Sequence, residues 1–130
     1  MSTRTNISSG APYESIFGYS RAVKVGNMVF VSGSTAIQPN GTVAGVGDAY
    51  RQTITALRTI EKALHEAGAT MQQVVRTRMF ATNLNDTEAI GKAHAEFFRD
   101  IRPAATLMEI SRLVHPDMLI EIEADAVITE

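Results

Sequence analysis

Apolar and acidic residues alternate strictly along the end of the chain. Over residues 119–127 the apolar positions include Ile120, Ile122, Ala124 and Ala126, and the positions between them are Glu121, Glu123 and Asp125. A period of two predicts a β-strand with one apolar face and one acidic face. Neighbouring carboxylates on one face repel each other unless water or a cation meets them. The acidic face is therefore expected either to be solvated or to point into a polar site.

Two segments in the middle of the chain repeat apolar residues at steps of three and four, which predicts amphipathic helices. The first is expected to begin after Asp48 as its N-cap and to end at Gly68. The second is expected to begin at a capping box of Asn85 and Glu88 and to end near Arg99. The apolar stripe of the first is Tyr50, Ile54, Leu57, Ile60, Leu64 and Ala67, and that of the second is Ile90, Ala93, His94 and Phe97.

The remaining regular segments predict strands. They are expected at 19–25, 28–31, 74–81 and 105–111, in addition to 119–127. Gly26-Asn27 lies between two of them and predicts a hairpin turn. Thr70 and Gln73 predict a short capped turn before the strand at 74–81. Residues 1–18 are rich in turn-forming residues, and we expect a partly ordered arm that crosses the surface.

These elements follow the order ββαβαββ in a single domain, residues 1–130. Because both helices must bury an apolar stripe, they are expected on one face of a mainly antiparallel sheet, in an α+β layer. The other sheet face would carry Glu121 and Glu123 among apolar residues. A symmetric oligomer would cover that face, whereas a monomer would leave it wet.

The composition narrows the classes of function. The chain has 130 residues, 45% hydrophobic and 20% charged, as in an ordinary globular domain. A net charge of −2 supplies no basic field, so neither nucleic acid nor an anionic membrane is expected as a partner. The absence of cysteine excludes disulfides and thiolate catalysis. The N-terminus is polar and the longest wholly apolar run, 28–31, is too short to cross a bilayer, so a cytoplasmic protein is expected.

The polar side chains offer few catalytic arrangements. His65, His94 and His115 are scattered, with no orienting acid at a telling spacing, so neither a Ser-His-Asp triad nor a metal site is expected. His94 lies on an apolar stripe and is expected to be a half-buried histidine with a hydrogen-bond partner. Ser32 ends a strand, and we expect a structural hydroxyl there rather than a nucleophile.

Three motifs resemble the RidA (YjgF) family of enamine/imine deaminases. They are Gly26-Asn27-Met28 followed by an apolar run and Ser32-Gly33, the segment Arg102-Pro103-Ala104, and Ile120-Glu121-Ile122-Glu123-Ala124. The likeness covers residues 19–127 in the same order. It implies a chorismate-mutase-like fold and a homotrimer with active sites between subunits. It also implies hydrolysis of small reactive enamines or imines to 2-oxo acids and ammonia, with no cofactor.

The resemblance also suggests roles for individual residues. The family's pocket tyrosine corresponds to Tyr19, and the serine at the strand end corresponds to Ser32. The glutamate that positions the attacking water corresponds to Glu121. Burial would raise the pKa of such a carboxyl group and would let it transfer protons as well. The plain alternative is that Glu121 is one of several solvated carboxylates on a strand.

Three positions depart from the family pattern and predict a divergent subgroup. Ala105 stands where the family has the arginine that binds the substrate carboxylate, Leu107 where it often has cysteine, and Gly91 where a helix asparagine occurs. A pocket without that arginine is expected to act weakly or not at all on 2-aminoacrylate. Its substrate is expected to be larger or more apolar near residues 105 and 107.

Another arginine could replace the missing one. Tyr19 and Arg21 share a strand face, and a planar guanidinium binds carboxylates bidentately, so Arg21 is predicted to supply the charge near Ala105. The other candidates are Arg76, Arg78 and Arg112. Arg78 or Arg112 could equally serve in structural ion pairs, with Glu109 or Glu123.

The favoured function is therefore a cofactor-free deaminase for a small enamine or imine, working in a cleft between subunits. One alternative is a non-catalytic trimer that binds a small metabolite or a partner in the same clefts. RNA-cleaving or translation-inhibiting members form a further alternative within the family, to which the acidic balance of this chain gives no support.

Overall fold

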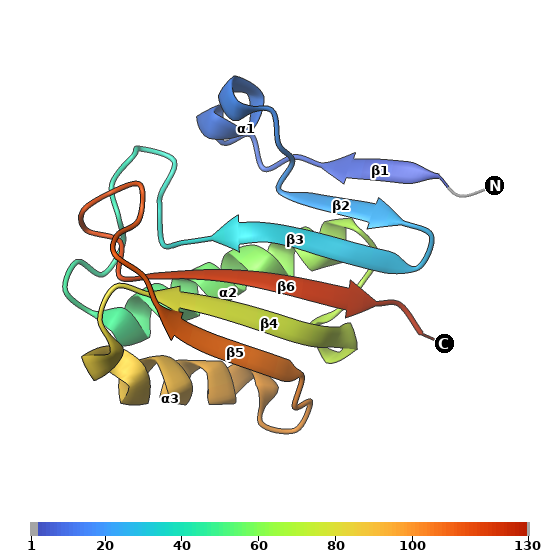
Figure 1. The fold of residues 1–130 in the computed structure, drawn as a ribbon. Coiled ribbons are helices and arrows are strands. Elements are labelled where there is room, and N and C mark those ends of the chain that lie inside the picture. The colour runs from blue at the N-terminus through green and yellow to red at the C-terminus, as the bar shows by residue number, and fades with distance from the viewer. Residues whose placement is uncertain (1–2, 130) are drawn as a thin grey trace.

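The computed structural model describes residues 3–129, and their central element is a six-stranded sheet (Figure 1). The strands, in the order of the sheet, are β1 (Arg4–Ile7), β2 (Ala22–Val25), β3 (Met28–Ser34), β6 (Ile120–Val127), β4 (Val74–Ala81) and β5 (Ala104–Glu109). Every neighbouring pair is antiparallel except β4 and β5, which run parallel. The prediction of a mainly antiparallel sheet is confirmed.

Two long helices cover one face of this sheet. Helix α2 (Ala49–Glu66) packs on β3 and β6, and α3 (Thr87–Phe98) packs against α2 (Figure 1). Asp48 caps α2 as predicted, because its side chain accepts a hydrogen bond from the backbone N–H of Arg51. The predicted stripe of α2 is buried from Leu57 onward, but Tyr50 and Ile54 are only half-buried. The first turns instead bury Gln52 and Thr53.

One capping prediction is confirmed and one is wrong. Thr70 and Gln73 form a reciprocal capping box at the short helix η1 (Met71–Gln73). Asn85 does not cap α3, because a separate short helix, η2 (Leu84–Asp86), precedes it. The cap of η2 is Asn83, whose side chain accepts a hydrogen bond from the backbone of Asn85.

The N-terminal region is more regular than predicted. Residues 4–7 form the edge strand β1, and Pro12–Phe17 form a short helix, α1. Pro12 occupies the first turn of α1, where a backbone N–H would have no acceptor within the helix, so the N–H that proline lacks is not needed there. Glu14 anchors the preceding residues because its buried carboxylate accepts hydrogen bonds from both hydroxyls of Ser8 and Ser9. The strand predicted at 19–25 starts only at Ala22.

The alternation along β6 has the predicted consequence. Its apolar positions are fully or almost fully buried beneath the helices, and its acidic positions are half-buried on the opposite face. We call that opposite face the open face. It also exposes large apolar side chains at Met28 (44%), Phe30 (42%) and Met108 (46%). The predicted mixture of acidic and apolar residues on this face is confirmed.

Candidate functional site

A broad groove of about 1080 Å³ lies at one end of the open face. Strand β4 contributes Phe80, and β6 contributes Glu121 and Glu123. The loop that joins β5 to β6, residues 110–119, forms much of the rim and contributes Arg112 and His115. Carboxylates, a guanidinium and an imidazole therefore share one concave surface with apolar walls, as in many small-molecule sites.

Glu121 lies against strand β3 at the one position where a side chain is missing. A Cβ added to Gly33 would come within 2.8 Å of the Glu121 Cδ atom, closer than real Cβ contacts allow. The register between β3 and β6 also shifts between Val31 and Ser34, which marks a bulge at Gly33. The bulge and the missing side chain together create the slot in which the carboxyl group lies.

The surroundings of Glu121 raise the pKa of its carboxyl group. Burial is the largest cause, because it penalises the charged form. The Arg21 guanidinium opposes this effect and the Glu123 carboxylate adds to it, and the net pKa stays above its usual value. A raised pKa makes the ionised carboxylate a stronger proton acceptor, and the protonated group can later return that proton.

Arg21 lies near Glu121, but it is not one of the residues that line the groove. Its side chain is only 8% exposed, and its Nη2 donates a hydrogen bond of 2.8 Å to the carbonyl oxygen of Gly33. Its guanidinium carbon lies 5.6 Å from the centroid of the Tyr19 ring. Within residues 3–129, the buried Nε of Arg21 has no acceptor. Arg21 therefore holds the carbonyl of Gly33 and places a positive charge near Glu121.

Ala105 and Leu107 lie several strands away from Arg21 in the sheet. Both are on β5, so β3, β6 and β4 separate them from β2, which Arg21 precedes. In the register of β4 and β5, Ala105 and Leu107 share the helix-covered face with Thr77 and Met79. Within one chain, Arg21 and Ala105 therefore do not meet. The prediction that Arg21 supplies the missing charge was made for a cleft between subunits, and it stays a prediction.

The Ser32 hydroxyl serves the backbone. Its Oγ donates a hydrogen bond of 2.6 Å to the carbonyl of Ser20, and its N–H bonds to the carbonyl of Arg21. These bonds tie the end of β3 to the segment before β2. Tyr19, in that segment, keeps its ring partly exposed. Ser32 and Tyr19 thus lie next to Arg21, and neither lines the groove.

The other arginines separate into two groups. Arg78 bridges Glu123 at 3.6 Å and Asp125 at 3.1 Å, so it is engaged in structural ion pairs on the open face. Arg76 stands opposite Asp125 in the register of β4 and β6. Arg112, by contrast, lines the groove with Glu121. The geometry therefore favours Arg112, a choice that the sequence left open.

Two histidines differ in their surroundings. His94 behaves as predicted: its Nε2 lies 2.9 Å from the Thr77 hydroxyl, and burial lowers its pKa. His115 lines the groove, and sequence reasoning missed it. The available signal was its place in His115-Pro116-Asp117, the turn just before the strand that carries Glu121.

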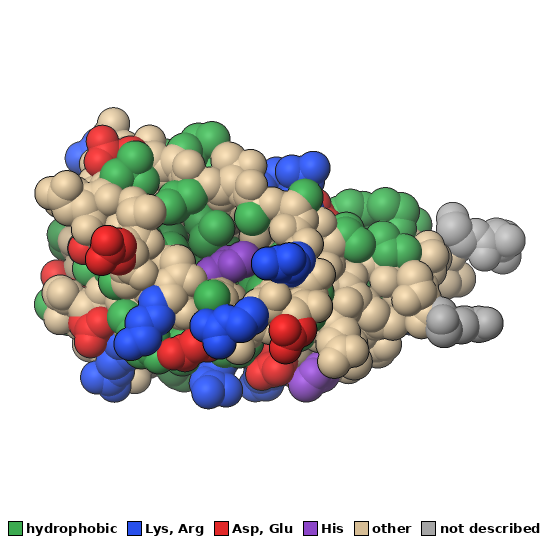
Figure 2. Space-filling model, turned by 90° about the horizontal axis from the view of Figure 1, so that it is seen from below, with side chains coloured by type: hydrophobic (Ala, Val, Ile, Leu, Met, Phe, Trp, Pro, Cys, Tyr) green, Lys and Arg blue, Asp and Glu red, His purple; other side chains and the backbone are tan. Residues whose placement is uncertain are grey.

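Metal and membrane chemistry receive no support from the geometry of the described chain. No group of three or more His, Asp or Glu side chains within residues 3–129 could hold a metal ion. None of the helices in that range is long and apolar enough to span a bilayer. The side of the molecule seen in Figure 2 intersperses basic and acidic side chains, so it offers no extended field of one sign.

Comparison with known proteins places this chain in a family. The family model described as Endoribonuclease L-PSP matches residues 9–128. A crystal structure of a YjgF/YER057c/UK114 family member from Mycobacterium tuberculosis has a TM-score of 0.89 and 44% identity, covering 97% of this chain and 100% of that one. The structure of the YjgF gene product from E. coli has a TM-score of 0.82 and 31% identity, covering 95% and 98%.

A curated relative carries a named activity. The 3-aminoacrylate deaminase RutC of Acinetobacter baylyi is 39% identical over 108 residues, which are 83% of this chain and 85% of that protein. The family model spans the fold from the arm before β2 to the end of β6, and the two structures cover 95% or more of this chain. This chain belongs to the YjgF/RidA/RutC family, whose model is described as Endoribonuclease L-PSP.

Proposed function

We propose that this protein hydrolyses a small enamine or imine to a carbonyl compound and ammonia in the groove at Glu121. The observation that carries the proposal is the placement of Glu121: a half-buried carboxyl group, set in a slot beside Gly33, with a raised pKa, in a groove with apolar walls. Such a group is suited to hold and activate one water molecule. The named activity of the RutC relative, a deaminase of 3-aminoacrylate, supports the same reaction class.

The reaction needs a proton carrier and no redox chemistry. An enamine first becomes an imine when one N–H proton moves to carbon. A water oxygen then adds to the carbon of the C=N bond, and Glu121 takes a proton from that water and passes it to nitrogen. In the resulting carbinolamine, Glu121 moves the remaining O–H proton to nitrogen as the C–N bond breaks. Ammonia leaves with the bonding electrons, and the carbonyl compound remains.

The assembly proposed for this activity is a homotrimer. The open face supports it, because Met28, Phe30 and Met108 would lose their exposed apolar surface when a second copy covers them. The groove lies on this same open face, so a second copy there would also cover part of it. The proposed active site thus lies between subunits.

The substrate is proposed to differ from 2-aminoacrylate. Ala105 offers only a methyl group, and Leu107 is an apolar neighbour on the same face of β5. Both residues lie on the helix-covered face, so the proposal of a larger or more apolar substrate rests on the guanidinium that Ala105 lacks. We therefore place this chain in a subgroup with altered specificity.

Ammonia release from a panel of imines tests the proposal directly. Imines are generated in the assay from different amino acids by an amino-acid oxidase, and ammonia is followed with and without the protein. Faster release for at least one imine, scaling with protein concentration, is the expected result. No acceleration across the panel, together with tight binding of one compound, would favour the non-catalytic alternative. Cleavage of RNA in place of imine hydrolysis would favour the ribonuclease alternative.

A further inference from the structure

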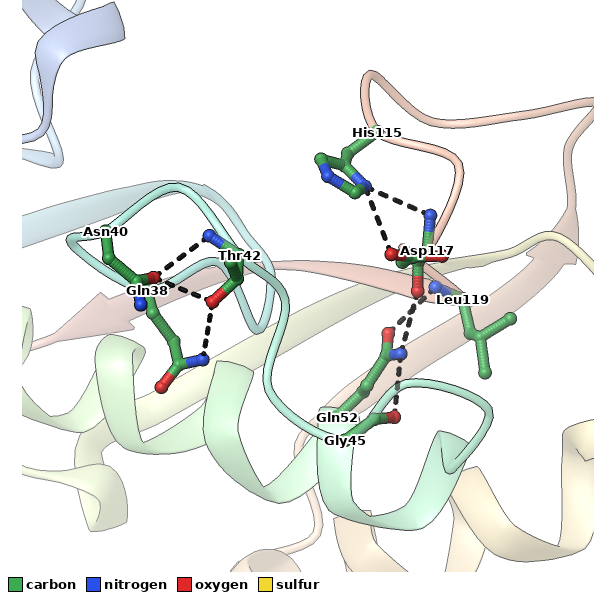
Figure 3. Close-up of polar contacts among 8 residues, drawn as sticks. All are labelled: Gln38, Asn40, Thr42, Gly45, Gln52, His115, Asp117 and Leu119. Atoms are coloured by element: carbon green, nitrogen blue, oxygen red, sulfur yellow. Dashed lines mark hydrogen bonds and ion pairs between the residues drawn. The ribbon is translucent and has the colours of Figure 1, made fainter.

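The loop over residues 110–119 is held in place by a buried side chain of α2. Gln52 has no exposed surface. Its Nε2 donates hydrogen bonds to the carbonyl of Asp117 at 2.9 Å and to that of Gly45 at 3.1 Å, and its Oε1 accepts one from the N–H of Leu119 at 2.8 Å (Figure 3). A single side chain therefore anchors the end of the loop to the helix. The loop residues that line the groove therefore belong to a loop whose end is fixed in position.

Asp117 in turn orients His115. The backbone N–H of Asp117 donates a hydrogen bond of 3.1 Å to Nδ1 of His115, and its carboxylate lies 4.0 Å from the same nitrogen (Figure 3). Because Nδ1 accepts this hydrogen bond, the neutral ring must carry its own proton on Nε2. Since His115 lines the groove, Nε2–H is available there as a hydrogen-bond donor.

Arg112 adds a permanent positive charge to the same rim. Among residues 3–129, no carboxylate lies within 4.0 Å of its guanidinium, whereas Arg78 already pairs with Glu123. The groove thus combines two kinds of group. Strand β6 contributes the Glu121 carboxyl group, which repels anions when ionised. The anchored loop contributes a guanidinium and an imidazole.

We propose that Arg112 and His115 form a carboxylate-binding subsite. Arg112 takes the carboxylate of the substrate, and Nε2–H of His115 donates to one of its oxygens. In this arrangement the C=N carbon of the substrate faces Glu121. The inference rests on the proposed function and names its substrate class, an imine or enamine that carries a carboxylate. It supplies from the loop a charge that Ala105 on β5 does not provide.

Equilibrium binding of a stable product tests the subsite without relying on turnover. Calorimetry with 2-oxobutanoate, and with its uncharged methyl ester, is carried out on the wild type and on Arg112→Met, His115→Gln and Arg99→Met. Arg99→Met removes the same charge at the end of α3, outside the groove, and is the matched control. Hydrogen bonds to charged groups account for the expected size of the effects.

The expected result is that wild type and Arg99→Met bind the acid at least tenfold more tightly than the ester. Arg112→Met should lose about tenfold or more for the acid and little for the ester, and His115→Gln should lose several-fold for the acid only. Arg112→Met binding the acid as tightly as Arg99→Met does, or wild type binding neither compound, overturns the subsite. Arg112-dependent binding without ammonia release from any imine would preserve the subsite and reject the proposed reaction.

Discussion

Replacing Gln52 with methionine should destabilise the protein far more than an ordinary glutamine replacement. Methionine matches glutamine in length but neither donates nor accepts strongly. The change therefore removes three hydrogen bonds and leaves the N–H of Leu119 and the carbonyls of Gly45 and Asp117 without this partner. An unsatisfied buried group costs about 1–3 kcal/mol. The N–H has the fewest alternatives and the carbonyls can turn toward water, so we expect a total loss of about 3 kcal/mol in the free energy of unfolding.

Urea denaturation at one fixed protein concentration measures this loss, since the stability of an oligomer depends on concentration. With a slope of about 2 kcal/mol per molar urea, the midpoint should fall by about 1.5 M. Gln38→Met is the matched control, because Gln38 is exposed and its side chain makes one hydrogen bond within residues 3–129, to the Thr42 hydroxyl. It should change the stability by less than about 0.5 kcal/mol. Equal midpoints for the two variants would refute the role assigned to Gln52 as the anchor of the loop.

Three further predictions concern the groove and the assembly. Activity should fall as pH drops through the raised pKa of Glu121, because only the carboxylate accepts a proton from water. This fall should occur at a higher pH than for an unperturbed glutamate, and a flat profile down to pH 4 would contradict the prediction. Gly33→Ala should change the free energy of unfolding by no more than about 1 kcal/mol, because the flexible end of Glu121 can move away from the added methyl group. The rate of ammonia release should fall about ten- to a hundredfold because the carboxyl group is displaced. An unchanged rate would show that the slot is irrelevant. Light scattering should give three times the mass of one chain, and a monomer at micromolar concentration would rule out an intersubunit site.

The framework of the fold could be predicted because its signals are local. The alternation in β6, the cap at Asp48 and the turn at Gly26 depend on neighbouring residues, and all three are present in the structure. Helix α1 could not be predicted in the same way. It is a short helix that begins at Pro12, and its preceding loop is held by hydrogen bonds to Glu14, which no periodic pattern reveals.

The site was only partly predictable because its contacts are distant in sequence. The sequence placed Glu121 on an acidic strand face, but its slot depends on Gly33, which lies on β3. Arg21 was expected at the substrate, which stays a prediction, and its hydrogen bond to the carbonyl of Gly33 could not be foreseen because it depends on the bulge in β3. His115 and Arg112 lie in a loop without periodicity. Their position depends on Gln52, a polar residue that the sequence alone would predict to be exposed.

Glu121→Gln compared with Glu123→Gln is the most direct test of the central claim. Both residues lie on the open face of β6 and line the groove, but Glu123 is paired with Arg78 while Glu121 occupies the slot beside Gly33. The account predicts that Glu121→Gln lowers ammonia release from the best imine by about 10²–10⁴-fold. This variant should be no less stable than wild type at neutral pH, because burial penalises the ionised form of Glu121. Glu123→Gln should stay within a few-fold of the wild-type rate. A Glu121→Gln variant as active as Glu123→Gln would contradict the assignment of Glu121 as the residue that activates water.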